Sequence, residues 1–143
     1  MMRLVADASV AIKWLLPAHH DERDLEKALE MLQRIKTEQI GLCQPPHWLA
    51  EVAAVVTRLS PETALEDVSD LYAMNIPVVQ SAHIFATACR LSKELDHHLF
   101  DTLYHAVALC LEGTVLVTAD ERYFNRAARR GRLALLRDFA WPA

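Results

Sequence analysis

Near its amino terminus the chain reads Leu4-Val5-Ala6-Asp7-Ala8-Ser9, a short apolar run that ends in a carboxylate. The apolar residues predict a buried strand over residues 3–6, and the helical spacing that follows predicts a helix from about residue 9 to residue 16. In open parallel sheets, ligands bind beyond the carboxyl ends of the strands, which is where Asp7 would lie. We therefore expect Asp7 to form one corner of an acidic site.

The rest of the chain alternates between helical and strand patterns. Helices are predicted over residues 25–35, 47–59, 61–72 (with Ser60 as N-cap), 82–95, 101–111 and 120–130. Strands are predicted over residues 41–44, 76–79, 114–118 and 133–136, and the third of these has the strongest signal. Such alternation is typical of an α/β fold, here a three-layer α/β/α sandwich with a central, mainly parallel sheet. No linker or repeat divides the chain, so we expect a single domain over residues 1–143.

The composition excludes several classes of protein. The 143-residue chain has a formal net charge of −4, the wrong sign for binding nucleic acid through a general basic surface. No apolar run approaches the ~20 residues needed to cross a membrane, and the amino terminus shows no signal-peptide pattern. The cysteines lie among apolar residues and predict reduced core thiols of a cytoplasmic protein: Cys43, Cys89 and Cys110.

Basic residues gather in the last part of the chain, at Arg122, Arg126, Arg129, Arg130, Arg132 and Arg137. Such a run fits two interpretations. It is either the solvated face of a helix or a local patch that contacts phosphates beside an acidic pocket.

Three aspartates have an ordinary local explanation, because Asp7, Asp101 and Asp120 each precede a predicted helix, where aspartate is a preferred N-cap. Glu51 differs. It flanks the apolar stripe of its helix, and a partly buried glutamate needs a partner, which Arg58 could supply.

Taken together, the four acids favour a different interpretation. Asp7 and Asp120 follow strands that end at one edge of the sheet, and Asp101 opens the helix that leads into the second of these strands. Gathered carboxylates repel one another, and a bound cation relieves that repulsion. Oxygen ligands suit Mg²⁺ or Mn²⁺. Ser9 and Thr118 lie beside two of the acids and could orient ligands or a water.

Four segments then carry a resemblance to a known family. They are Val5-Ala6-Asp7-Ala8-Ser9, Pro45-Pro46-His47-Trp48-Leu49-Ala50-Glu51-Val52, Phe100-Asp101-Thr102-Leu103-Tyr104-His105-Ala106 and Val117-Thr118-Ala119-Asp120. In this order and spacing they resemble the four blocks of the PIN-domain family. In size and in the details of the blocks, the chain is most similar to VapC-type toxins of bacterial toxin–antitoxin pairs.

The resemblance implies a metal-dependent endoribonuclease that cuts structured RNA such as tRNA or ribosomal RNA. The metal-binding and catalytic acids would be Asp7, Glu51, Asp101 and Asp120, with Ser9 and Thr118 in support and Mg²⁺ or Mn²⁺ as the cofactor. Flanking phosphates would meet Arg122, Arg126, Arg129 and Arg130. VapC-type toxins usually dimerise and are inhibited by a small antitoxin from the same operon. The resemblance therefore implies a homodimer and a groove near helices 11–16 and 25–35 that receives the antitoxin.

Other functions stay open at this point. The chain could be a housekeeping PIN nuclease or a catalytically silent protein-binding module. A haloacid-dehalogenase-type phosphatase needs an acid two residues after Asp7, where this chain has Ser9, and a receiver domain needs an acid after the 76–79 strand. His105 is expected at a helix surface or core edge, and three glycines leave no room for a phosphate-binding loop.

Overall fold

Four parallel strands form the centre of the molecule in this computed structural model, which describes residues 1–16 and 22–141. In order across the sheet they are β2 (Gly41–Leu42), β1 (Arg3–Ala6), β3 (Thr114–Thr118) and β4 (Leu133–Leu135). The two central strands pair with Ala6 opposite Val117, so they end side by side. The predicted α/β fold with a parallel sheet is therefore confirmed.

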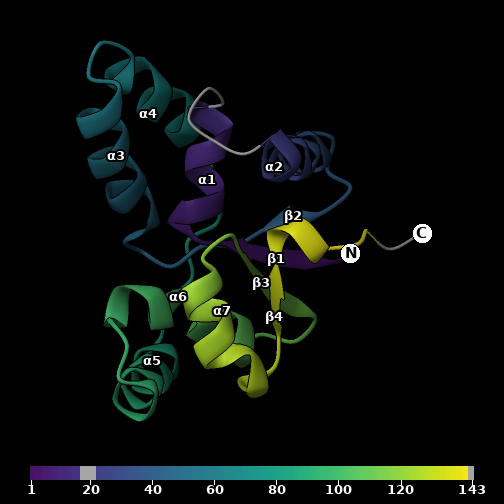
Figure 1. Ribbon diagram of the computed structural model, residues 1–143, viewed down its shortest axis with the longest axis vertical. Helices are drawn as coiled ribbons and strands as arrows, with labels where there is room; N and C mark the ends of the chain where they lie inside the picture. Colours follow the sequence, from purple (N-terminus) through teal and green to yellow (C-terminus); the bar gives the residue numbers. More distant parts are fainter. Residues whose placement is uncertain (17–21, 142–143) are drawn as a thin grey trace.

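Helices cover both faces of this sheet (Figure 1). On one side lie α1 (Ala8–Leu15), α2 (Glu22–Lys36), α3 (Trp48–Leu59) and α4 (Ala64–Ala73). On the other side lie α5 (Ala82–Leu95), α6 (Leu99–Cys110) and α7 (Glu121–Ala127). Short 3₁₀ turns follow at Ala128–Arg130 and Leu136–Asp138. Helix α6 packs against both β1 and β3, which places its side chains beneath the ends of these strands.

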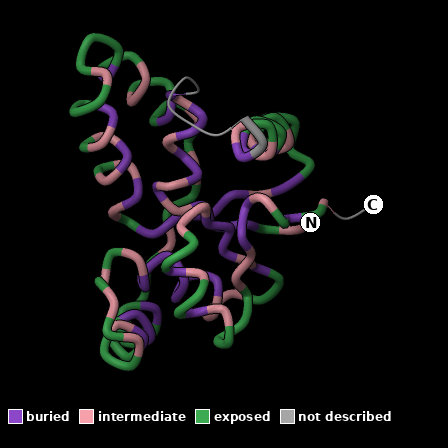
Figure 2. The backbone as a smooth tube through the Cα atoms, viewed as in Figure 1, coloured by how far each residue is buried: buried purple, intermediate pink, exposed green. Residues whose placement is uncertain are grey.

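The hydrophobic core runs along the two central strands (Figure 2). Leu4 and Val5 of β1 are fully buried, as is Val117 of β3. Strands in a parallel sheet are covered on both faces, so apolar residues follow one another without alternation. Because the middle of these strands is apolar and buried, polar residues occur at the strand ends, where a site can form.

Two predicted elements differ from the structure. The helix expected from residue 61 begins at Ala64, because Thr63 N–H donates to Ser60 O (3.1 Å) and closes a turn ahead of the helix. Ser60 is therefore the C-cap of α3 and not an N-cap. The predicted strand over residues 76–79 is reduced to an isolated bridge between Val78 and Gln44.

The expectation of three core cysteines was right only for Cys43. Cys89 is exposed on α5 and Cys110 is half-buried, and all three thiols are free. Within the described part of the chain, no helix is long and apolar enough to cross a membrane.

Candidate active site

Asp7 lies between the end of β1 and the start of α1, and its side chain does not cap that helix. Its two carboxylate oxygens instead accept hydrogen bonds from the hydroxyls of Ser9 (2.5 Å) and Thr118. Ser9 Oγ also accepts the N–H of Ala119 (2.9 Å), which ties the start of α1 to the end of β3. The local N-cap explanation is therefore wrong for the Asp7 side chain, and both expected supporting residues contact it.

Gln44 fixes the strand end that carries Asp7, a role that the sequence analysis missed. Its side-chain Oε1 accepts the N–H of Ala6 (2.9 Å), and its Nε2 donates to Ala6 O (2.7 Å). The fully buried amide thus substitutes for a neighbouring strand at the last residue of β1. A buried side-chain amide must be hydrogen-bonded. A glutamine between an apolar strand and Pro45-Pro46 could therefore have indicated this role.

Asp120 does cap a helix. Its Oδ1 accepts the N–H of Tyr123 (3.2 Å) at the start of α7. Its own N–H donates to Thr118 Oγ1 (3.0 Å). Thr118 therefore links Asp120 to Asp7 and holds the ends of the two central strands in one arrangement.

Asp101 is the third residue of α6 and not its N-cap, which corrects the prediction. The helix begins earlier because His98 serves as the N-cap, with its Nδ1 accepting the N–H of Phe100 (3.1 Å). Asp101 Oδ2 accepts a hydrogen bond from His97 Nε2 (2.7 Å). The Asp101 carboxylate does not cap α6. It is therefore available to a ligand on the helix face that also carries Tyr104.

Glu51 projects from α3 toward the same region. Its Oε1 accepts from the Tyr104 hydroxyl (3.3 Å), whereas the partner expected from sequence, Arg58, is exposed near the far end of the helix. His47 Nε2 lies 3.7 Å from Glu51 Oε2. Burial lowers the pKa of His47, and its Nε2 donates to Phe100 O (2.8 Å), so this contact is not an ion pair at neutral pH.

Two of the carboxylates, Asp7 and Glu51, have a raised pKa. Burial raises the pKa of Asp7 to about 6, and the charges of Asp101 and Asp120 add to this, against the hydrogen bonds from Ser9 and Thr118. Burial likewise raises the pKa of Glu51 to about 7, again helped by Asp101 and Asp7. Such effects act between neighbouring charges, so Asp7 lies near Asp101 and Asp120, and Glu51 lies near Asp7 and Asp101.

This donor set fits a hard divalent cation, since it offers only carboxylate and hydroxyl oxygens. Among the described residues, no three acidic, histidine or cysteine side chains are already drawn close enough to enclose an ion. Each carboxylate is turned to a donor of the protein instead, as expected for like charges that repel.

A layer of aromatic and histidine side chains lies behind Asp101 and Asp120. The His97 ring packs edge-on against Tyr123 (4.8 Å between centroids), and the Tyr123 hydroxyl meets His105 Nδ1 (2.8 Å). His105 Nε2 faces Gly131 O (2.8 Å), which only accepts, so Nε2 carries the proton and Nδ1 accepts from Tyr123. His105 was expected at a helix surface or core edge, but it is fully buried, and burial lowers its pKa.

The arginines divide into two groups. Arg126 donates to the carbonyl of Asp96 (2.8 Å) and Arg130 pairs with Glu94 (2.7 Å), so both guanidinium groups are engaged with the end of α5. Arg122 and Arg129 are exposed. Of the four arginines expected to meet phosphates, these two are the better placed for a ligand.

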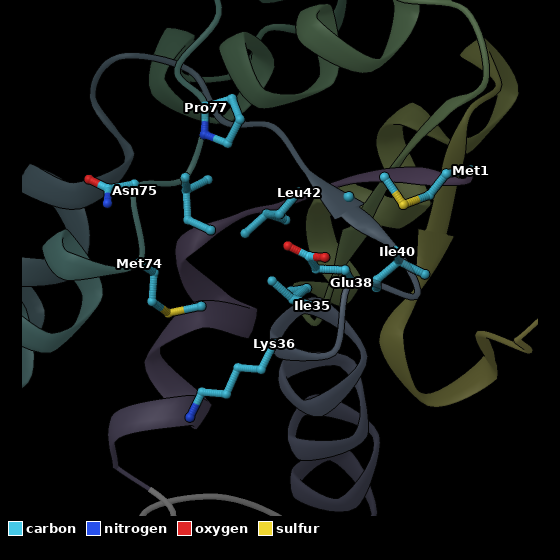
Figure 3. Close-up of a pocket in the computed structure, with 11 residues that line it drawn as sticks. Met1, Ile35, Lys36, Glu38, Ile40, Leu42, Met74, Asn75 and Pro77 are labelled. Carbon is cyan, nitrogen blue, oxygen red and sulfur yellow. The ribbon is translucent and has the colours of Figure 1, made fainter.

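A pocket of about 750 Å³ lies away from these acids, beside edge strand β2. Figure 3 shows Ile35, Leu42 and Met74 converging on it. None of the four carboxylates lines it, and it borders the amino ends of β1 and β2. The acidic site instead lies beyond the carboxyl ends of β1 and β3.

Comparison with known proteins agrees with this geometry. Residues 4–130 match the PIN domain family. The chain belongs to the PIN-domain family. PIN domains are generally nucleases and typically use a divalent metal.

Among solved structures, this PIN domain is similar to a chain in the crystal structure of VapBC2 from Rickettsia felis bound to a DNA fragment from their promoter. The TM-score is 0.66 at 17% sequence identity, covering 94% of this chain and 98% of that chain. At that identity the likeness shows the fold. No individual curated protein matches the chain.

Proposed function

We propose that this PIN domain is a Mg²⁺- or Mn²⁺-dependent endoribonuclease of the VapC type, the toxin of a toxin–antitoxin pair, which hydrolyses tRNA or ribosomal RNA. The observation that supports a hydrolytic metal site is the raised pKa of Asp7 and of Glu51, to which the neighbouring charges of Asp101 and Asp120 contribute at Asp7 and those of Asp101 and Asp7 at Glu51. Such an arrangement destabilises the fold unless a ligand of opposite charge compensates it, so selection for stability alone would not produce it.

Each acid would contribute carboxylate oxygens to the cation. A bound cation supplies a water of lowered pKa and stabilises negative charge on the phosphate. Ser9 and Thr118 orient both oxygens of Asp7 by donating to them. Tyr104 and His97 do the same for one oxygen each of Glu51 and Asp101. No side-chain nucleophile is needed.

The proposed antitoxin would bind between α1, α2 and α4. A pocket of about 250 Å³ lies there, lined by apolar residues such as Trp14, Leu32 and Leu71 and by the charged residues Lys36, Asp67 and Asp70. This lining suits an apolar segment. Expression of the chain alone is expected to arrest growth, and co-expression of a small protein encoded beside it is expected to relieve the arrest.

A homodimer is expected by light scattering.

The nuclease activity is tested on purified protein with total RNA. We expect discrete cleavage products in Mg²⁺ or Mn²⁺ and none in excess EDTA. Asp101→Asn should lower the rate at least about 100-fold, because several kcal/mol of charge stabilisation depend on the metal. Cleavage that persists in EDTA, or an unchanged rate in the variant, would rule out the proposed site.

A second prediction concerns His97, which we expect to position Asp101. His97→Phe keeps the ring packed on Tyr123 but removes the donor to Asp101. Loss of such an outer partner typically weakens metal binding by about 10- to 100-fold. Isothermal titration with Mn²⁺ should show this loss, and His97→Gln, which retains a donor, should recover most of it.

The matched control is His83→Phe, which changes an exposed histidine of α5. Its Mn²⁺ affinity should equal that of the wild type. If His97→Phe binds Mn²⁺ as tightly as this control, His97 has no positioning role.

A further inference from the structure

Phe100 is 52% exposed although it directly precedes Asp101. Its ring contacts two histidine rings, edge-on with His98 (4.8 Å between centroids) and tilted with His47 (5.2 Å). The backbone on both sides of the ring is fixed, because Phe100 N–H donates to His98 Nδ1 (3.1 Å) and Phe100 O accepts from His47 Nε2 (2.8 Å). An exposed aromatic ring is therefore held in one place.

This ring is connected to the acidic site by further rings. His47 also packs on Tyr104 (4.6 Å between centroids), and the Tyr104 hydroxyl donates to Glu51 (3.3 Å). Phe100 is thus the outer end of a series of aromatic side chains whose inner end contacts a proposed metal ligand. A group that rests on Phe100 would lie beside whatever the carboxylates hold.

The charges of the chain favour such a contact for a nucleic-acid substrate. The net charge is −4, and two of the four arginines nearest in sequence to Asp120 are engaged with α5. Phosphate contacts, which dominate most nucleic-acid affinity, are therefore few. Stacking of a base on an aromatic ring needs no positive charge and is available only to unpaired bases.

We propose that Phe100, flanked by His47 and His98, stacks an unpaired nucleobase next to the phosphodiester that the acidic site cleaves. The proposal rests on the proposed nuclease function and specifies its substrate as a single-stranded segment or loop of RNA. Base-paired RNA cannot present a base face to this ring without unpairing.

The test uses a short unstructured oligoribonucleotide that contains one 2-aminopurine, whose fluorescence falls on stacking. The protein carries Asp7→Asn to prevent cleavage. Scanning the 2-aminopurine along the oligonucleotide should identify one strongly quenched position. Adding Phe100→Ala should remove the quenching and weaken binding by about 5- to 100-fold, the range found for one stacked base. Phe100→Trp should restore both.

A companion oligonucleotide that is abasic at the quenched position provides the second arm. Loss of the base should weaken binding to the Asp7→Asn protein as much as Phe100→Ala weakens binding of the intact oligonucleotide. When the abasic oligonucleotide and Phe100→Ala are combined, the two losses of affinity should not add. The control is Tyr72→Ala, which removes a more exposed aromatic side chain from α4 and should leave binding unchanged.

The proposal is overturned if Phe100→Ala leaves the RNA affinity unchanged, or if its effect adds fully to that of the abasic site. It is also overturned if Phe100→Ala changes the oligomeric state, measured by light scattering, while RNA binding stays unchanged. The last would mean that a second copy of the chain covers Phe100. These failures differ from failure of the nuclease function itself, in which the wild type would neither cleave nor bind RNA.

Discussion

Asp7→Asn is expected to abolish metal-dependent RNA cleavage while making the metal-free protein more stable above pH 6. The rate should fall at least about 100-fold, because the proposed metal ligand that also bridges the ends of β1 and β3 through Ser9 and Thr118 loses its charge. Asparagine keeps the shape and can still exchange hydrogen bonds with both hydroxyls. The cost of burying a charge among like charges disappears.

The pH dependence follows from the raised pKa of Asp7. The pKa rises from 3.8 to about 6 in the folded protein, so the unfolded chain gives up this proton at lower pH than the folded one. Its stabilising contribution is complete below pH ~4 and is lost as the pH rises through about 6. The ionised side chain then costs about 2–3 kcal/mol, at 1.36 kcal/mol per unit of pKa.

Thermal unfolding in EDTA measures this effect. The difference in Tm between Asp7→Asn and the wild type should grow between pH 4 and pH 6 and stay constant above. Addition of Mn²⁺ at pH 8 should raise the Tm of the wild type and leave the variant unchanged. Asp70→Asn, at an exposed position of α4, should show neither effect. A variant less stable than the wild type at pH 8 would contradict the assigned environment of Asp7.

Gln44→Leu is expected to destabilise the fold by about 2–5 kcal/mol. Leucine has a similar volume, but it leaves the N–H and the carbonyl of Ala6 without their side-chain partners. Each buried backbone group that loses its partner costs about 1–3 kcal/mol. Because Ala6 directly precedes Asp7, we also expect weaker Mn²⁺ binding at temperatures where the variant is folded.

Urea unfolding gives the free-energy difference. Gln80→Leu is the control, since Gln80 is exposed and should change stability by less than about 0.5 kcal/mol. If Gln44→Leu is as stable as this control, the amide does not complete the sheet at β1.

Much of the fold follows from local patterns. The uninterrupted apolar residues of β1 and β3 indicated buried parallel strands, and their burial confirms it. Helix α5 begins and ends where predicted, because Ser81 caps it through the N–H of Ile84 (3.1 Å). Less regular elements were misjudged. The turn at 60–63 and the bridge at Val78 depend on hydrogen bonds that the spacing of apolar residues does not predict.

By itself, the sequence predicted which acids belong to the candidate site, because parallel strands must end at a common edge and four blocks occur in order. Only the tertiary structure decided what each acid contacts. Asp7 and Thr118 are 111 residues apart, and Glu51 meets Tyr104 across 53 residues. A capping preference is a local property, whereas these contacts depend on how α3, α6 and the sheet pack. For that reason Asp7, which looked like a helix cap, is held by Ser9 and Thr118, and Asp101 by His97.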